Sequence, residues 1–457
     1  MASRLHIRIG FASVIIICSL ILAASYISDA SRDPTGTFRE QAALPPGERV
    51  PLAPPRESIT VVTSHLLERG YILALNPNGT VRYYGDSHHA YWDVDPSPAG
   101  SETVLYSTST EVHNTSRCTP VRSGGYCIRH GIERANLTTG TVTTLYSRVD
   151  PRYESSEWHD VDRIGDSHLV VADMYSDEVF ILNLTSGMVV WEWSVQGHQP
   201  LHAGGPYPED WTHLNDVEVL EDGRIMVSLR NMDQVVFLDR QRGVIEDWTL
   251  GSEDAHRILY EQHNPDYISA EFGGPAVVIA GSENNRVVEY KRTPNGTWNR
   301  TWLWKDSRLQ WPRDADRLPN GHTLITDTHG GRVIEVDEDG EIVWQLDVPV
   351  AYEAERLETG DESAGGPSAS RAGIPSVTAE SESNEKDSSP IVRIKSWIKG
   401  RFPNKLVNGI TAVTPVWVGL FDLVVLLFGL FSFVLWIGLE TWWAPYSLRN
   451  PVKRRET

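Results

Sequence analysis

The feature that most constrains the fold is a repeat with a period of about 50 residues. Four segments align along it, and each continues into short strands rich in β-branched and aromatic side chains. Gly-containing turns separate these strands, and helical periodicity is almost absent. The segments begin at His159, His213, His263 and Arg313, so that successive starts are 54, 50 and 50 residues apart. This period, with four strands in each unit, predicts the blades of a β-propeller.

Two further units complete the expected ring. A longer unit begins near His89, and strands in the segment 70–85 belong to a sixth unit. We expect chain from the other end of the ring to pair with these strands, because such closure leaves no exposed strand edge. The sequence therefore predicts an all-β fold, a six-bladed β-propeller over residues 55–355.

Two apolar runs flank the predicted propeller. The first follows Arg4 and Arg8 and predicts a signal anchor or transmembrane helix within residues 1–30. The second is interrupted by Asp422 and predicts a transmembrane helix over residues 410–440. Three other segments complete the expected organisation: a disordered acidic Ser-rich linker at 356–390, a basic amphipathic juxtamembrane segment at 391–408 and a basic tail at 441–457.

The charge balance excludes one class of partner. The chain has 61 acidic and 41 basic residues, which gives a formal net charge of −20. Binding to nucleic acid needs a basic face that neutralises phosphates, so we expect no nucleic-acid partner. The acidic excess indicates either a solvated surface or adaptation to high salt.

Two features indicate that the propeller faces the extracytoplasmic side of the cell membrane. Cys18 lies in the first apolar run, which leaves Cys118 and Cys127 as one candidate disulfide, with two free thiols as the alternative. The other feature is a set of six candidate glycosylation sites of the form Asn-x-Ser/Thr, at Asn78, Asn114, Asn136, Asn183, Asn295 and Asn299.

The first residues of the four segments form the candidate binding site. In a propeller the innermost strands line a central channel, and equivalent positions in successive blades converge at one rim. We therefore expect three imidazoles and one guanidinium to face one axial pocket, which favours an anionic ligand. Acids recur a few positions later, and we interpret them as hydrogen-bonding groups that tie neighbouring loops together: Asp162, Asp216, Asp266 and Asp316.

Three motifs carry a resemblance to a known family: WHD at 158–160, DWTHLN at 210–215 followed by SLR at 228–230, and EQH at 261–263. The middle motif is the most specific, because a loop of this composition followed one strand later by Ser-x-Arg is rare by chance. With these motifs, roughly residues 150–350 resemble the bacterial arylsulfate sulfotransferases, which are six-bladed propellers. The terminal apolar runs and the acidic excess favour a haloarchaeal, membrane-anchored branch of that family.

The resemblance implies a ping-pong transfer of a sulfuryl group from an aryl sulfate donor to a phenolic or other hydroxyl acceptor. No nucleotide donor, cofactor or metal is expected. His263 would be the nucleophile that carries the group between donor and acceptor. The other matches are Arg230, His213 and Asn215 at oxygen-binding positions, His159 as a histidine that binds the group or protonates the leaving oxygen, and Arg313 and Thr328 by blade position only.

Two other classes of function remain open at this point. One is a non-catalytic propeller that serves as a binding or scaffold module, because a fold does not guarantee an activity. The other is a metal-dependent lyase or hydrolase that uses the histidines as ligands. Arg230 and Arg313 would repel a cation at the same rim, and none of the rim histidines belongs to an HxH or HxxxH pair that would set a coordination geometry. The sulfotransferase is therefore the preferred hypothesis.

Overall fold

The computed structural model describes residues 2–30, 34–65, 69–98, 100–113, 126–150, 157–379, 401–415 and 418–444. The chain forms two compact units. One contains both terminal segments, with residues 1–33, 388–401 and 410–457, and the other contains residues 34–387 and 402–409.

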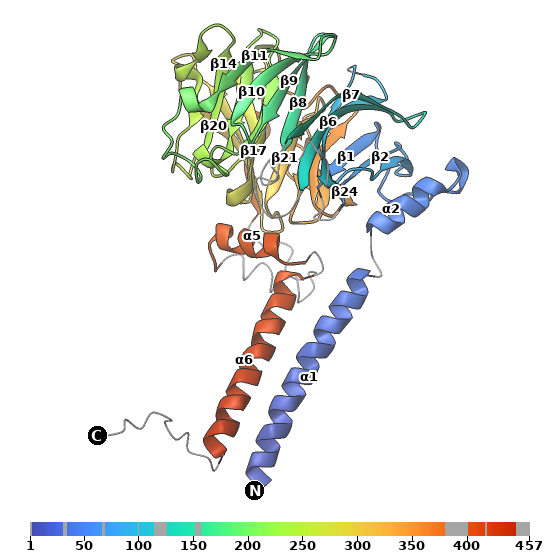
Figure 1. Ribbon diagram of the computed structural model, residues 1–457, viewed down its shortest axis with the longest axis vertical. Coiled ribbons are helices and arrows are strands. Elements are labelled where there is room, and N and C mark those ends of the chain that lie inside the picture. The colour runs from blue at the N-terminus through green and yellow to red at the C-terminus, as the bar shows by residue number, and fades with distance from the viewer. Residues whose placement is uncertain are drawn as a thin grey trace. The chain divides into compact units, whose positions relative to one another are not determined.

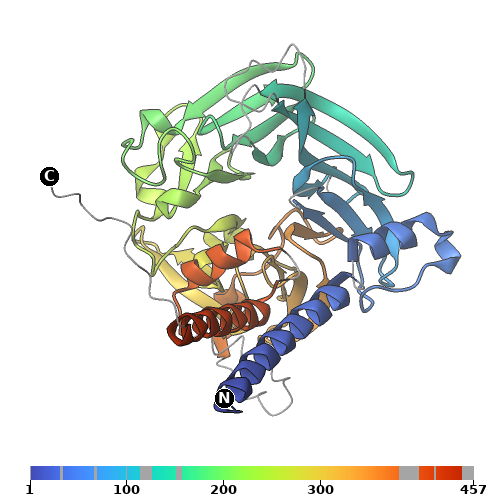
Figure 2. The same ribbon diagram turned by 60° about the horizontal axis from the view of Figure 1, so that its bottom comes forward.

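The larger unit contains six β-sheets that follow one another around a ring (Figures 1 and 2). From the innermost strand outwards, the first three are β25 (Ala351–Arg356), β1 (Thr60–Ser64), β2 (Tyr71–Leu75) and β3 (Val81–Gly85); β4 (Ala90–Pro96), β5 (Thr103–His113), β6 (Tyr126–Asn136) and β7 (Thr141–Asp150); and β8 (Trp158–Ile164), β9 (His168–Asp173), β10 (Glu178–Asn183) and β11 (Met188–Ser194).

The remaining three sheets follow the same order. They are β12 (Leu214–Val219), β13 (Ile225–Leu229), β14 (Gln234–Asp239) and β15 (Gly243–Val244), with β16 (Leu250–Gly251) also on β14; β17 (His263–Ile268), β18 (Ala276–Gly281), β19 (Arg286–Arg292), β20 (Trp298–Asp306) and β26 (Val377–Ala379); and β21 (Pro312–Arg317), β22 (Thr323–Asp327), β23 (Arg332–Val336) and β24 (Ile342–Asp347).

The ring closes through a strand from its far end. β25 pairs antiparallel with β1, with Val61 opposite Glu355, so that the last inner strand completes the blade that the first three strands begin. The six innermost strands then contact one another in the cyclic order β25, β4, β8, β12, β17, β21. The predicted six-bladed propeller is thereby confirmed.

Apolar side chains between neighbouring sheets form the core. Trp302 and Trp304 on β20, for example, are 1% exposed and pack with Ala315 and Ile325 of the next blade. Short helices lie in the connections: α2 (Pro34–Ala43), α3 (Ala369–Ala372), and the 3-10 turns η1 (Pro46–Glu48), η2 (Val195–Gly197), η3 (Arg230–Met232), η4 (Glu246–Trp248), η5 (Ala270–Phe272) and η6 (Ser282–Asn284).

The smaller unit contains two long apolar helices, α1 (Ala2–Ala30) and α6 (Leu420–Trp443), which run side by side in Figure 1. Arg8 and Glu440 form a salt bridge of 2.5 Å between them. The stretches Arg4–Ser28 and Phe421–Trp443 are long and apolar enough to cross a membrane. The helix α5 (Asn404–Val413) precedes α6 in the chain.

The structure differs from the expected disordered linker over its first part. Residues 357–379 lie on the propeller, where β26 pairs parallel to β20, and Ala369 and Ile374 are buried in its core. The backbone NH of Ala369 donates to Glu289 Oε2 at 2.7 Å. Apolar residues of this Ser- and Glu-rich stretch pack against the propeller. The average composition of the stretch does not reveal them. Residues 380–390 and the start of the juxtamembrane segment, 391–400, lie outside the described residues, as does the tail from residue 445.

Candidate active site

The rim residues of the site lie at irregularities that recur on the innermost strands. The antiparallel register between the first two strands of a blade skips one inner residue at His159, Asn215, Asn264 and Arg313. Such bulges bend a strand and redirect the side chain of the extra residue. His263 begins β17, and His213 directly precedes β12 with a left-handed φ of 47°.

The candidate histidines lie in sequence around the channel. The ring centroids of His159 and His213 are 5.3 Å apart, and those of His213 and His263 are 6.2 Å apart, both with edge-to-face geometry. Trp311 continues the series at 5.4 Å from His263. The structure thus brings three histidines of three successive blades close together, although the strand register places Asn215 and Asn264, not His213 and His263, at the position that His159 occupies.

Hydrogen bonds determine the tautomer of His263. Nδ1 of its ring is 2.8 Å from Ser282 Oγ, and Ser282 Oγ is 2.7 Å from the carbonyl oxygen of Pro312. A carbonyl can only accept, so the single hydroxyl proton of Ser282 is donated to Pro312, and Ser282 must accept from His263. The proton of His263 is therefore on Nδ1, and Nε2 carries a free lone pair. No described residue hydrogen-bonds this buried Nε2.

His263 also remains neutral. Its side chain is fully buried, and burial, followed by the positive charges of Arg313 and Arg230, lowers its pKa well below the usual value. A neutral imidazole with an unprotonated Nε2 is the form that can act as a nucleophile.

His213 is oriented by a carboxylate. Its Nδ1 lies 2.7 Å from Asp210 Oδ1, so that Nδ1 donates and Nε2 is available to accept a proton. Burial and the charge of Arg230 lower the pKa of His213 below its usual value. Burial alone would raise the pKa of Asp210, but the hydrogen bond from His213 and its charge lower it to about 2. His213 is therefore a neutral base, and the ionised carboxylate of Asp210 orients it.

His159 is the third neutral imidazole. It is 3% exposed, and burial, followed by the neighbouring His213 and the charge of Arg313, lowers its pKa well below the usual value. Its ring packs on Trp92 with centroids 4.6 Å apart, and within the described residues its Nδ1 has no partner.

Two arginines supply positive charge at this rim. Arg230 donates through Nη2 to Glu261 Oε2 at 2.8 Å, and its buried Nε has no partner in the described part of the chain. Glu261 also pairs with Lys405, on the part of α5 that belongs to the propeller unit. Arg313 is 7% exposed, and burial lowers its pKa to about 10, at which it stays charged at neutral pH.

Asn215 offers an acceptor to the channel. Its Nδ2 donates to the backbone oxygen of Gln262 at 3.0 Å, while its Oδ1 has no partner among the described residues. An amide oxygen cannot donate to an anionic sulfuryl oxygen. In this arrangement Asn215 positions the backbone next to His263.

Thr328 is likewise engaged with the backbone. Its Oγ1 donates to the carbonyl of Ala351 at 2.9 Å, which ties the blade of β22 to β25. Thr328 was a candidate for substrate binding by its blade position alone. Its hydroxyl proton is instead used in a hydrogen bond between two blades.

Sequence reasoning missed several aromatic residues of the rim. Nη1 of Arg313 donates to the ring of His65 at 2.9 Å, and that ring stacks on Trp92 with centroids 5.0 Å apart. Tyr352 lies edge-on to Trp92 and His159, at 5.1 and 5.6 Å. The sequence contained a pattern that could have identified two of them. Trp92 and Tyr352 each precede an acid-x-acid run, as His159 does.

The other predicted sites lie away from the rim. Cys127 is disulfide-bonded, whereas Cys118, its expected partner, and Asn114 lie outside the described residues. Of the other glycosylation candidates, Asn78, Asn295 and Asn299 are exposed and Asn136 and Asn183 are half-buried. A cavity of about 510 Å³ is lined by residues such as Tyr260 and Lys405, and none of the rim histidines lines it.

These observations define a class of protein: a six-bladed propeller that gathers neutral imidazoles and guanidinium groups at one end of its channel, which suits an anionic group. Residues 187–349 match the model of the Arylsulfotransferase (ASST) family, which confirms the resemblance to arylsulfotransferases seen in the motifs. The match spans the blades of β12, β17 and β21 and leaves His159 outside. No protein among curated sequences matches the chain.

Solved structures with similar chain paths are distant. A protein of unknown function from Bacteroides caccae shares 13% identity with a TM-score of 0.43, covering 66% of this chain and 99% of its own. A periplasmic gluconolactonase of Pseudomonas aeruginosa gives 12%, 0.42, 66% and 99% for the same quantities. A catalytically inactive virginiamycin B lyase variant from Staphylococcus aureus, solved with quinupristin, gives 8%, 0.37, 64% and 85%.

Proposed function

We propose that this protein transfers a sulfuryl group from an aryl sulfate ester to a hydroxyl acceptor, in two half-reactions that share a sulfohistidine at His263. The observation that carries the proposal is the state of His263: a buried, neutral imidazole whose Nδ1–H is held by Ser282 and whose Nε2 lone pair has no described partner. The match of this segment to the arylsulfotransferase family supports the same chemistry.

In the first half-reaction, Nε2 of His263 attacks the sulfur of the donor. The S–N bond forms as the bond between sulfur and the aryl oxygen breaks, and the aryloxide leaves with the electron pair of that bond. Arg230 and Arg313 stabilise the negative charge on the sulfuryl oxygens and the leaving oxygen. Both guanidinium groups act on His263 electrostatically, which supports a position near the reacting atoms.

In the second half-reaction, the oxygen of the acceptor attacks the sulfur of the sulfohistidine. The S–N bond breaks and its electrons return to Nε2, while the hydroxyl proton of the acceptor passes to a base. His213 suits this role, because it is neutral with Nδ1 donating to Asp210, so its Nε2 can accept the proton and Asp210 then stabilises the imidazolium. The next aryloxide takes this proton back. His159 is a second neutral imidazole in the site, and we assign it to contact with the transferred group.

We also propose that the propeller faces the extracytoplasmic side of the membrane. Disulfide bonding of Cys127 and the exposed acceptor residue Asn78 support this orientation. Protease added to intact cells should then cut the chain near Glu380. Cutting only after lysis would reverse the assignment.

The mechanism is tested with the full-length protein in detergent and nitrophenyl sulfate labelled with ³⁵S. Given donor alone, the protein should release one burst of nitrophenol and acquire an acid-labile label on the peptide that contains His263. Addition of phenol should then discharge the label onto the acceptor. A label on another residue would remove the nucleophile assignment, and no cleavage with any aryl sulfate would favour a non-catalytic binding module.

A further inference from the structure

The innermost strands carry a second, acidic section directly after the rim residues. On five of them an acid-x-acid run follows the rim residue, as in Trp92-Asp93-Val94-Asp95 and Tyr352-Glu353-Ala354-Glu355. Because a strand advances about 3.3 Å per residue, these carboxylates lie roughly 3 to 10 Å further along the channel. The acids of this section have pKa values raised above their usual range, chiefly by burial: Asp93, Asp95, Asp160, Asp162, Asp216, Glu218, Asp266, Asp314, Asp316, Glu353, Glu355, Asp361 and Glu362.

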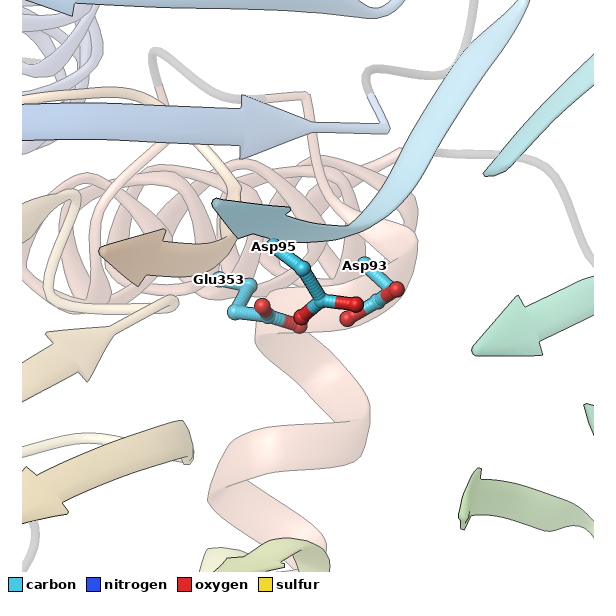
Figure 3. Close-up of side chains that lie close together, drawn as sticks. All are labelled: Asp93, Asp95 and Glu353. Carbon is cyan, nitrogen blue, oxygen red and sulfur yellow. The ribbon is translucent and has the colours of Figure 1, made fainter. Parts of the chain in front are cut away.

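Some of these carboxylates converge closely enough to share one ion. One oxygen each of Asp93, Asp95 and Glu353 lie within 4.8 Å of one another, and Figure 3 shows the carboxylate group of Asp95 between those of Glu353 and Asp93. Asp95, Asp162 and Asp361 meet the same criterion. Asp95 therefore belongs to two overlapping groups, whereas a third group, Asp266, Asp314 and Asp316, is separate.

Buried oxygens without partners point to a ligand at this place. Asp95 is 3% exposed, and its Oδ2 has no hydrogen-bond partner within the described residues. Asn264, which is not part of the acidic group, is 6% exposed and donates through Nδ2 to Glu353 Oε2 at 3.0 Å. Its Oδ1 also has no partner among the residues described. Buried polar atoms in folded proteins are almost always satisfied, so an unpartnered oxygen on Asp95 and another on Asn264, which contacts Glu353, indicate a missing electropositive partner.

Backbone NH groups of Val94 and Val161 donate to Glu353 and Asp93, but no described lysine or arginine pairs with the group. Across the described ranges, no salt bridge joins Asp93, Asp95 or Glu353 to a lysine or arginine. Protons can neutralise these carboxylates one at a time, as their raised pKa values indicate, whereas one bound cation would offset the charge of several carboxylates at once.

We propose that Asp93, Asp95 and Glu353 bind a calcium ion in the central channel, with Asn264 as a neighbouring oxygen ligand. Calcium accepts six to eight oxygen ligands in flexible geometry, whereas magnesium requires a near-ideal octahedron and retains several waters. Zinc prefers the nitrogen and sulfur ligands that this section lacks. The sequence-based expectation of no metal considered only the rim, where Arg230 and Arg313 repel a cation, and the acidic section is a different place.

The position of the ion gives it a structural role. Glu353 lies on β25, the strand that closes the ring, and Asp93 and Asp95 lie on β4 of the next blade. An ion held by both strands joins the closing blade to its neighbour. Calcium should therefore stabilise the folded propeller by binding it in preference to the unfolded chain.

The test uses the full-length protein in detergent, stripped with a chelator and dialysed. Isothermal titration should show calcium binding at least ten times tighter than magnesium, and saturating calcium should raise the unfolding midpoint while magnesium at the same concentration does not. A stripped protein that binds neither ion, or whose midpoint responds equally to both, overturns the proposal.

Matched variants locate the ion. Asp95→Asn should weaken calcium binding at least tenfold, whereas Asp216→Asn should bind as the wild type does. Asp216 is equally buried and also has an oxygen without a described partner, but it belongs to none of the three groups. Equal affinities in the two variants would contradict the location. If Asp95→Asn does not fold, Glu353→Gln is used in its place, and the comparison of calcium with magnesium on wild-type protein still decides whether the site exists. Binding is measured without any donor, so the result is independent of the role of His263.

Discussion

The two sections of the channel lie on the same innermost strands and use them differently. At the rim the residue varies from blade to blade: Trp92, His159, Asn215, Arg313 and Tyr352 occupy related places. On five of the six innermost strands the next residue is aspartate or glutamate, and on β17 it is Pro265. The repeat is thus nearly uniform at one position and varied at the position before it.

Hydrogen bonds explain the uniform position. One carboxylate oxygen of Asp160 accepts from the backbone NH of Val217 on the next inner strand, at 2.5 Å, and Asp93 accepts in the same way from Val161 at 3.2 Å. Asp162 accepts from Val219 at 2.6 Å. One oxygen of each of these acids ties neighbouring blades, whereas rim residues such as His263 leave a polar atom free without making such a tie. In this repeat, the position that varies little hydrogen-bonds adjacent blades, and the position that varies from blade to blade carries candidate site residues such as His159 and Arg313.

The largest expected effect concerns the rim alone. His263→Ala should abolish sulfuryl transfer, by roughly 10⁴-fold or more, because the covalent intermediate cannot form. The rate of nitrophenol release with phenol present measures the effect. His168→Ala is the matched control, since His168 lies on β9 outside the channel and should leave the rate unchanged. If the His263→Ala protein retains turnover, the rim does not carry the catalytic nucleophile, and the proposed division between a catalytic rim and a structural acidic section is wrong.

A smaller loss is expected for a charge that stabilises the transferred group. Arg230→Ala should lower kcat by about 10² to 10³, the usual cost of removing one oxyanion-stabilising group, while the ³⁵S label still forms slowly on His263. Arg300 is exposed and serves as the control in Arg300→Ala. If Arg230→Ala reacts at the wild-type rate, Arg230 has only a structural role through its salt bridge with Glu261.

The two sections should respond to pH with opposite signs. The rim histidines have lowered pKa values, so below pH 6.5 the unfolded chain takes up protons that the folded protein does not, and stability falls as pH falls. Burial raises the pKa of Asp160 and Asp314 to about 7 and that of Asp361 to about 8. The folded protein therefore holds protons that the unfolded chain has lost, and stability is lost as pH rises through these values.

Between pH 6.5 and 8 the acidic section contributes to this difference together with Glu157, whose pKa burial raises to about 7. The free energy of unfolding of calcium-free protein should fall there by about 1.4 kcal/mol per pH unit for each proton that the folded form alone retains. Asp160→Asn should reduce the slope, since an amide still accepts from Val217 but does not ionise. Asp254→Asn, at an exposed side chain, should not. Denaturant titrations at pH 6.5, 7 and 8 measure the slope, and a flat or rising profile would show that the carboxylates are not linked to folding in this way.

The sequence predicted the ring because its evidence is repetitive. The aligned starts from His159 to Arg313 determined the blade period, and completion of the first blade by distant chain followed from closure, although the closing strand β25 pairs with β1 and not with segment 70–85. The repeat also led to the expectation that the three histidines lie near one another, but it aligned them one or two residues out of register, since Asn215 and Asn264 are the true counterparts of His159. What the repeat could not give was hydrogen-bond direction: Asn215 donates to the backbone, and Ser282, in a turn that no motif marks, determines the tautomer of His263. Packing of residues 357–379 was missed because a few apolar contacts outweigh a polar composition.

The smallest expected effect tests that missed residue. Ser282→Ala removes the acceptor of the His263 Nδ1 proton, so the ring can also adopt the tautomer in which Nε2 is protonated and cannot attack. Loss of one neutral hydrogen bond is worth about 1 kcal/mol, which corresponds to a decrease of roughly tenfold or less in the rate of donor cleavage. Ser282→Thr retains a hydroxyl and should restore most of the rate, whereas a loss of folding alone would lower the amount of active protein without changing the rate per labelled site. Single-turnover rates divided by the ³⁵S burst make that separation. If the alanine variant cleaves donor as fast as wild type, or threonine is as slow as alanine, Ser282 does not control the tautomer, and the nucleophile must be activated from another side of its ring.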